Sequence, residues 1–265
     1  MKTVKMKFFA FVSISAMSVS LLFGQNIGDK RTQAGLTGTF GLNSLRMETT
    51  KMNSNGLGSD LGIGIAVHSS LKNSKNLGLA YGLEFEFGTY KFKPASATYY
   101  SYNDKVILSN IDSKDATGTF QLTERTQKPV YVTVPIMFLF RTDFIGDFRY
   151  FGKFGVRNNF LVSNKMNDTG YDSAASGQST ELLNMTSRGE TFFYNGSVGM
   201  TGGAEWNFVG STALVAEFGY FYGITPLFLD RRDENKLYIK DNLTNPFFSN
   251  SAKLSQFMLK VSILF

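Results

Sequence analysis

Cysteine is missing from the chain, and histidine and proline are scarce. The 265 residues include no Cys, one His and five Pro. Without Cys there is no disulfide framework, no thiolate metal site, no thiol nucleophile and no N-terminal Cys to carry a lipid. One His leaves no histidine cluster for a metal. We therefore expect neither a cofactor nor a metal site.

Long hydrophobic runs are also missing after the first 24 residues. A membrane helix needs roughly 18 or more consecutive apolar residues, and no later stretch reaches that length. Phe8–Phe23 is apolar, follows three lysines and precedes Gly24, which is typical of an export signal. Four serines dilute this stretch and favour cleavage over the alternative, a single membrane anchor. We predict a signal peptide over 1–24 and a mature domain over 25–265.

Clustered positive charge is a third absence. The formal charge is +6, but Lys and Arg are scattered and no recognition-helix pattern accompanies them. We therefore expect no nucleic-acid partner.

Glycine and aromatic residues are abundant, with 26 Gly, 26 Phe and 12 Tyr. Eight stretches alternate large apolar residues with small or polar ones, which is the period of a β-strand with two different faces. Leu77–Phe87 alternates most clearly. The predicted strands are Gln33–Asn43, Asp60–Ser69, Leu77–Phe87, Pro129–Arg141, Phe148–Val162, Thr191–Phe208, Thr212–Ile224 and Lys253–Phe265.

The connections between these strands are alternately long and short. Outer-membrane barrels have short periplasmic turns and longer extracellular loops. The sequence thus predicts an all-β fold: an eight-stranded antiparallel up-and-down transmembrane β-barrel with four long extracellular loops and short periplasmic turns. Both termini would be periplasmic, in a bacterial outer membrane. A soluble sandwich or lipocalin-type barrel is the alternative, but it would hold its large residues inside.

Charged residues fall on the same strand faces as the glycines. Because an eight-stranded barrel is only wide enough for side chains, opposite charges there should pair and plug it. A narrow gated pore is the alternative. The predicted lumen charge network consists of Glu84, Glu86, Lys153, Arg157, Glu205, Glu217 and Lys260.

The last strand ends the chain on an aromatic residue, as the assembly signal of outer-membrane β-barrels does. We expect it to pair with the first strand and to be recognised by the barrel-assembly machinery. The residues of this predicted signal are Phe257, Leu259, Val261, Ile263 and Phe265.

No catalytic group emerges from the pattern. His68 lies beside Ser69, at the predicted periplasmic end, where one hydrogen bond explains it better than catalysis. Glu84 and Glu86 share a strand face, but glycosidase chemistry needs a sugar cleft that a filled lumen lacks. We predict that the protein is not an enzyme.

The long connections contain aromatic and basic residues. The aromatic ones would anchor a partner or pack loop on loop; they are Tyr99, Tyr100, Tyr102, Pro226–Leu229 and Asn245–Phe248. The basic ones would contact lipopolysaccharide phosphates; they are Arg231, Arg232, Lys236 and Lys240.

Three of the strands resemble those of the PorT-like outer-membrane β-barrel family. They contain Val132–Ile136 (VTVPI), Gly202–Trp206 (GGAEW) and Glu217–Gly223 (EFGYFYG). This resemblance implies the same fold and location, and a link to type IX protein secretion, to which the founding member is tied. We expect a non-enzymatic scaffold or anchor that binds other envelope or secretion proteins. A small-solute channel is the alternative, and a lipid-active enzyme the weakest.

Overall fold

Fourteen β-strands make up the regular structure of the residues described in a computed structural model of this chain. The residues described are 31–72, 74–108, 115–174, 178–187, 190–209, 212–228, 238–239 and 250–265, so the predicted signal peptide lies outside them. The strands are β1 (Thr32–Met47), β2 (Met52–Ser54), β3 (Gly58–Ser70), β4 (Leu77–Gly88), β5 (Tyr90–Pro94), β6 (Thr98–Asn103), β7 (Val106–Leu108), β8 (Gly118–Arg141), β9 (Phe148–Asp172), β10 (Ser179–Met185), β11 (Tyr194–Val209), β12 (Thr212–Gly223), β13 (Tyr238–Ile239) and β14 (Ala252–Leu264).

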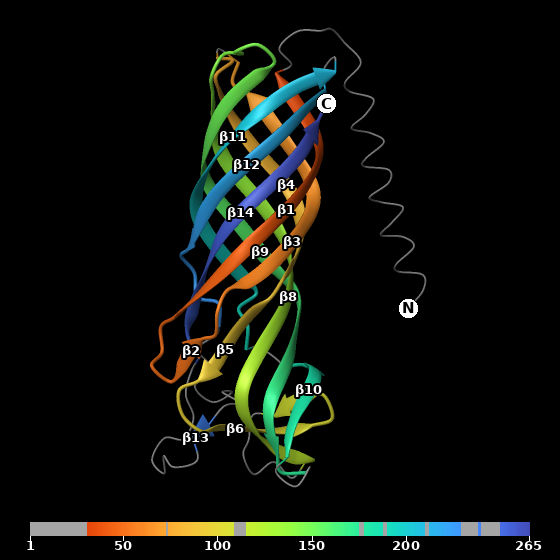
Figure 1. The fold of residues 1–265 in the computed structure, drawn as a ribbon, viewed down its shortest axis with the longest axis vertical. Coiled ribbons are helices and arrows are strands. Elements are labelled where there is room, and N and C mark those ends of the chain that lie inside the picture. Colours follow the sequence, from red (N-terminus) through yellow and green to blue (C-terminus); the bar gives the residue numbers. More distant parts are fainter. Residues whose placement is uncertain are drawn as a thin grey trace, which may run out of the picture.

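Eight of these strands form a closed antiparallel barrel. Their order around the ring is β1, β3, β4, β8, β9, β11, β12 and β14, and β14 pairs with β1 to close it (Figure 1). Each of the eight predicted strands corresponds to one of them. The predicted fold class is therefore confirmed.

The two ends of the barrel differ in their connections. Short turns join β3 to β4, β8 to β9 and β11 to β12 at one end, which we call the short-turn end. Phe265 lies there and exchanges backbone hydrogen bonds with Ala34, at 2.9 and 3.4 Å. The long connections leave from the opposite end, the loop end, so the described start of β1 and the end of the chain are neighbours.

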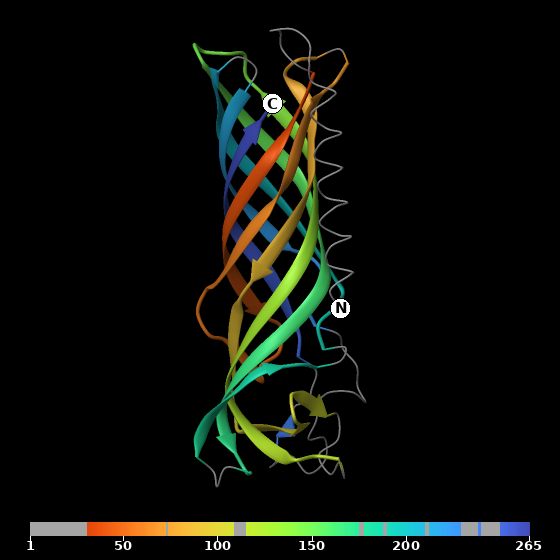
Figure 2. The same ribbon diagram turned by 90° about the vertical axis from the view of Figure 1, so that its right-hand side faces the viewer.

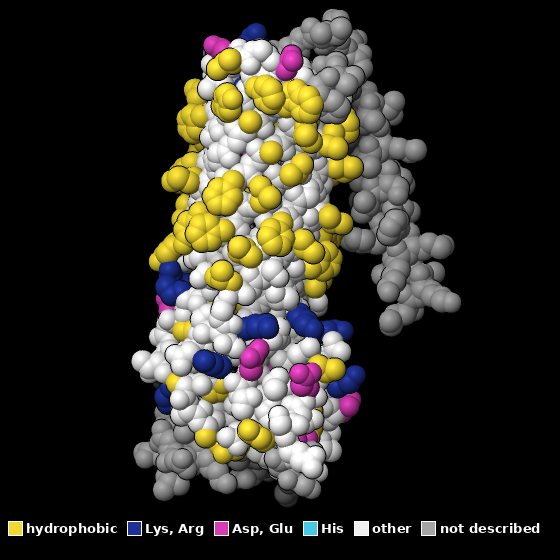
Figure 3. Space-filling view, in the orientation of Figure 1, with side chains coloured by type: hydrophobic (Ala, Val, Ile, Leu, Met, Phe, Trp, Pro, Cys, Tyr) yellow, Lys and Arg dark blue, Asp and Glu magenta, His cyan; other side chains and the backbone are white. Residues whose placement is uncertain are grey.

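A hydrophobic band surrounds the barrel between its two ends (Figure 3). Large side chains at alternate strand positions point outward, for example Ile63, 65% exposed, and Phe138, 60% exposed. Water would not favour a continuous apolar surface of this kind, whereas lipid would. The soluble-barrel alternative was wrong because the large residues lie outside the barrel.

The long connections fold together into what we call the loop domain, which continues the barrel beyond the band (Figures 1 and 2). It contains the outer halves of β8 and β9 together with β2, β5, β6, β7, β10 and β13. The sequence predicts only long loops between the barrel strands over Lys93–Lys128 and Ser163–Glu190, and this was wrong. The apolar residues of the core there are spread over several short strands, so no single stretch alternates for long.

Aromatic side chains from the long connections fill this core. Tyr100 is fully buried and Tyr102 nearly so, and Leu227 and Phe228 pack with them. Tyr90 and Phe92, where the alternation of β4 changes phase, also point into this core. For these residues the structure favours loop-on-loop packing. Asn245–Phe248 and the four basic residues from Arg231 to Lys240 lie outside the described residues.

Candidate functional site

The barrel lumen holds five acidic and five basic side chains among the described residues. All ten are buried, and the numbers of the two signs match. They are Asp60, Glu84, Glu86, Glu205 and Glu217, and Arg141, Arg149, Lys153, Arg157 and Lys260. The seven predicted members of the charge network are all in this set.

Arg157 and Glu84 form the centre of the network. Alternation turns both side chains inward, Arg157 from β9 and Glu84 from β4. Arg157 Nη2 donates to Glu84 Oε2 at 3.1 Å and also to Glu86. Lys260 of β14 donates to the other oxygen of Glu84. Three strands that are not neighbours are thus joined through the lumen.

Glu217 forms a second ion pair on the short-turn side of this centre. Lys153 donates to Glu217 Oε2, and Thr201 Oγ1 lies 3.4 Å from the same oxygen. Lys260 Nζ is 3.8 Å from Glu217 Oε1, so Lys260 lies between the carboxylates of Glu84 and Glu217. The two ion-pair clusters are therefore one continuous network.

Glu205 is the acid closest to the short-turn end. Arg149 Nη2 donates to both of its oxygens, at 2.8 and 3.0 Å, and Gln33 Nε2 lies 3.4 Å from Oε1. Glu205 therefore pairs separately from Glu84 and Glu217.

Small residues make room for these long side chains. Gly62 lies on the lumen face of β3, where an added Cβ would be 3.2 Å from Glu86 Cγ and 3.3 Å from Thr39 Cβ. An alanine there would push against the Glu86 side chain. The glycine at position 62 is thus explained by the charged side chain opposite.

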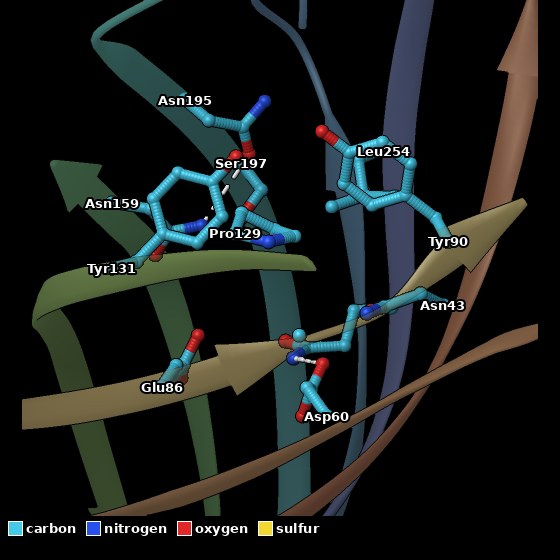
Figure 4. A pocket seen from close by; sticks show the side chains of 12 residues that line it. Asn43, Asp60, Glu86, Tyr90, Pro129, Tyr131, Asn159, Asn195, Ser197 and Leu254 are labelled. Carbon is cyan, nitrogen blue, oxygen red and sulfur yellow. Dashed lines mark hydrogen bonds between the residues drawn. The ribbon is translucent and has the colours of Figure 1, made fainter. Parts of the chain in front are cut away.

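A polar chamber lies between the charge network and the loop domain (Figure 4). Asn43 and Asp60 line one side, and Tyr131, Asn159 and Asn195 face them. Gln256 Nε2 donates to Asp60 at 2.6 Å, and Asn159 Nδ2 donates to Asn195 at 3.3 Å. The chamber volume is about 20 Å³, which is space for roughly one or two water molecules. The lumen is filled by side chains over this length.

Sequence reasoning missed Asp60 as a lumen charge. Asp60 shares its strand face with Gly62 and Gly64, so the alternation that placed the other lumen residues would also have placed it. We treated it only as the start of a strand.

His68 is buried in the lumen. Its ring meets the ring of Phe151 edge to face, with 6.2 Å between centroids. Within the described ranges, no group of three or more acidic, His or Cys side chains could bind a metal ion. In the same part of the chain, we find no helix with the length and hydrophobicity to span a membrane.

A second buried charge cluster lies in the core of the loop domain. Arg125 of β8 forms a bidentate ion pair with Asp168 of β9. Nη2 donates to Oδ2 at 2.7 Å and Nε donates to Oδ1 at 2.8 Å. Glu190 lies 3.1 Å from Arg125 Nη1, and the Tyr100 hydroxyl donates to Asp168 at 2.7 Å. Burial lowers the pKa of Arg125, but Asp168 and Glu190 outweigh it and raise the pKa above its ordinary value. No sequence signal marked this cluster, because Arg125 resembles a surface residue.

The residues of the predicted assembly signal lie on the outer face of β14. Phe257, Leu259, Val261, Ile263 and Phe265 are all between 43% and 50% exposed. They extend the hydrophobic band along one strand to the short-turn end. Recognition by the barrel-assembly machinery stays a prediction.

Comparison with known proteins gave one family match and several structural similarities. The model of a family described as "outer membrane protein beta-barrel domain" matches residues 23–229. No curated protein matches the chain.

The solved structures similar to this chain include the following three. Ail of Yersinia pestis is 13% identical with a TM-score of 0.33, covering 89% of this chain and 100% of its own. OprG of Pseudomonas aeruginosa is 9% identical with a TM-score of 0.38, covering 91% and 98%. Neisserial surface protein A is 9% identical with a TM-score of 0.34, covering 87% and 97%.

Proposed function

The chain belongs to the outer membrane protein β-barrel domain family, and from this premise we propose that it is a non-enzymatic scaffold or anchor for a cell-envelope assembly. The family is one of the bacterial outer membrane, and the match covers most of the chain. In this proposal the barrel holds the protein in the membrane and the loop domain binds the partner.

The filled lumen is the observation that supports this proposal best. Ten buried charges of balanced sign occupy the barrel. Arg157 and Lys153 bond carboxylates of strands that are not their neighbours, and Arg149 bonds Glu205 of the adjacent strand. A barrel filled in this way offers no wide path for a solute. The folded loop domain, in contrast, offers a surface of fixed shape.

The proposed orientation places the short-turn end in the periplasm and the loop domain outside the cell. The alternation of short and long connections supports it. Both ends of the mature chain would then be periplasmic. This arrangement agrees with export through the predicted signal peptide, 1–24, and with recognition of the last strand by the barrel-assembly machinery.

A finer proposal is a role in type IX protein secretion. It rests on the likeness of Val132–Ile136, Gly202–Trp206 and Glu217–Gly223 to the PorT-like family. Partners would then be other envelope or secretion proteins.

Affinity capture from cross-linked envelopes tests the scaffold role. We expect a stoichiometric partner with the wild type and its loss in Tyr171→Ser with Leu183→Asp, two exposed apolar residues of the loop domain. The control is Ile65→Ser, which replaces an exposed residue of the hydrophobic band. Recovery of no stoichiometric partner, or equal recovery with both variants, contradicts the proposal.

A small-solute channel is the second candidate, favoured by the polar chamber. Asn43, Asp60 and Asn195 give the loop-end half of the lumen a polar lining. Planar-bilayer recording separates the two proposals. If the protein is a scaffold, the wild type should show no conductance. Stable unitary conductance of the wild type would support the channel.

A further inference from the structure

Lysines gather on the outer surface where the hydrophobic band meets the loop domain. Figure 3 shows Lys and Arg side chains along this edge of the band. Lys91 and Lys93 of β5, Lys128 of β8 and Lys165 of β9 are all exposed there. Val162, 63% exposed, lies just on the membrane side of Lys165.

The strand register brings three of these lysines together. Lys128 and Lys165 are directly opposite on neighbouring strands, so their Cβ atoms are about 5 Å apart. Lys91 opposes Thr126, two residues along β8 from Lys128. A diagonal of this kind measures about 7–8 Å, which long side chains span easily. The ammonium groups of Lys128 and Lys165 can therefore meet over one point, and Lys91 can reach this point by turning away from Glu124.

Hydrogen-bonding residues lie beside the lysines. Thr126 of β8 pairs with Asn167 of β9, two residues along each strand from the Lys128 and Lys165 pair. Asn167 Oδ1 accepts the backbone N–H of Asn184 at 3.1 Å, and this bond orients its amide. A phosphate above this row would meet a hydroxyl and an amide as well as ammonium groups.

Glu124 is the acidic residue nearest to this patch. Its oxygens are 3.8 Å from Lys91 Nζ and 2.8 Å from Asn55 Nδ2, so it is held by these two residues. Like charges directly opposite each other destabilise a sheet, and the Lys128 and Lys165 pair has this unfavourable arrangement. An anion bound between them would remove the repulsion.

We propose that Lys91, Lys128 and Lys165, with Thr126 and Asn167, form a binding site for the phosphate groups of an outer-leaflet glycolipid. The lysines lie directly beyond Val162, which faces the lipid, so they are at the level of the lipid headgroups. This position supports a lipid as the source of the phosphate. The site rests on the proposed outward orientation of the loop end and not on the scaffold role.

Titration of the purified full-length protein with diphosphorylated lipid A, followed by native mass spectrometry, tests the site. We expect Lys128→Gln with Lys165→Gln to bind roughly 30-fold more weakly, since each lysine near an anionic surface contributes about fivefold. The control pair, Lys72→Gln with Lys105→Gln, removes two exposed lysines elsewhere. It should bind as the wild type does.

Two further arms identify the ligand. Lipid A stripped of phosphate should bind the wild type and the Lys128 and Lys165 double variant equally weakly. Inorganic phosphate alone should compete poorly, since it lacks the acyl chains that pack on the band. Equal affinity of both double variants for lipid A overturns the proposal, as does full competition by inorganic phosphate. Heat-modifiable mobility of each variant shows that its barrel is folded.

Discussion

Lys260 of β14 forms an ion pair with Glu84 of β4 through the lumen, although β1 and β3 separate the two strands in the barrel wall. Backbone hydrogen bonds join only neighbouring strands, so this pair adds a connection that the sheet lacks. The lumen charges therefore brace the barrel across its diameter as well as filling it.

Replacing Glu84 with Gln should destabilise the barrel strongly. The change leaves the charges of Arg157 and Lys260 without their shared carboxylate, and breaking a buried pair costs about 3–5 kcal/mol. Urea unfolding in lipid vesicles measures the loss. The control Glu48→Gln breaks the exposed pair with Lys253, 2.7 Å long, and should cost at most about 1 kcal/mol. Equal losses would show that the lumen network is not a stabilising core.

Replacing Arg157 with Ser should make the barrel leak cations. The guanidinium of Arg157 bonds both Glu84 and Glu86, and a serine leaves two carboxylates beside a wider, hydrated lumen. We expect a small cation-selective conductance in planar bilayers, read from the reversal potential in a salt gradient. Lys128→Gln, a change on the outer surface, should show no conductance. A silent Arg157→Ser variant would mean that other side chains are sufficient to close the lumen.

Replacing Phe265 with Ala should lower assembly of the barrel in the outer membrane. Phe148→Ala is a matched control, because both phenylalanines are 44% exposed and lie at the short-turn end. Phe148→Ala loses a side chain of the same exposure and also its stacking on Trp206, so a larger loss for Phe265 reports recognition of the last residue. The measurement is the amount of heat-modifiable protein in envelopes. Equal amounts for the two variants would contradict the assembly role.

Replacing Asp168 with Asn should unfold the loop domain and spare the barrel. Arg125 would lose the negative charge of Asp168 and one of the two oxygens that accept its hydrogen bonds, a local cost of about 3–5 kcal/mol. Limited proteolysis should cut the variant within the loop domain, while heat-modifiable mobility persists. Glu124→Gln, at a partly exposed position of the same strand, should resist proteolysis. Loss of heat modifiability in Asp168→Asn would show that the two parts fold together.

The loop domain should lose stability at high pH through Tyr102. Burial and the hydrogen bond to Asp172 raise the pKa of Tyr102 to about 12, compared with about 10 in an unfolded chain. Its stabilising contribution is therefore complete below about pH 10 and is lost as the pH rises through about 12. Near-ultraviolet circular dichroism during urea unfolding follows this loss.

Tyr102→Phe is the variant for the pH experiment. It should reduce the slope of stability between about pH 10 and 12. Some slope should remain, because burial also raises the pKa of Tyr100. An unchanged slope in Tyr102→Phe would contradict the assignment.

The barrel strands could be predicted because alternate residues face the lipid and the lumen. Lipid favours large apolar side chains, whereas the narrow lumen favours small or polar ones. Leu79 and Tyr81 face outward while Ala80 and Glu84 face inward, and the sequence alone shows this period. The same period places Glu217 and Lys260 inside. It does not give the partners, since the contact of Lys260 with Glu84 depends on strand stagger around the ring.

The loop domain could not be predicted in the same way. Its strands bury an ion pair, so Arg125 and Asp168 look like surface residues in the sequence. The register between β8 and β9 shifts between Leu122 and Glu124, which breaks the alternation at this point. A buried ion pair and an irregular register together remove the signal on which the prediction of the barrel depended.

The length of β8 and β9 has a mechanical consequence. β9 has 25 residues, or roughly 80 Å at about 3.3 Å per residue, and only about 9–11 residues are needed to cross the membrane. The two strands continue from the barrel wall into the loop domain as unbroken strands, with one register shift between Val130 and Tyr131. A pull on the loop domain would therefore tilt the barrel in the bilayer before the two parts could bend apart.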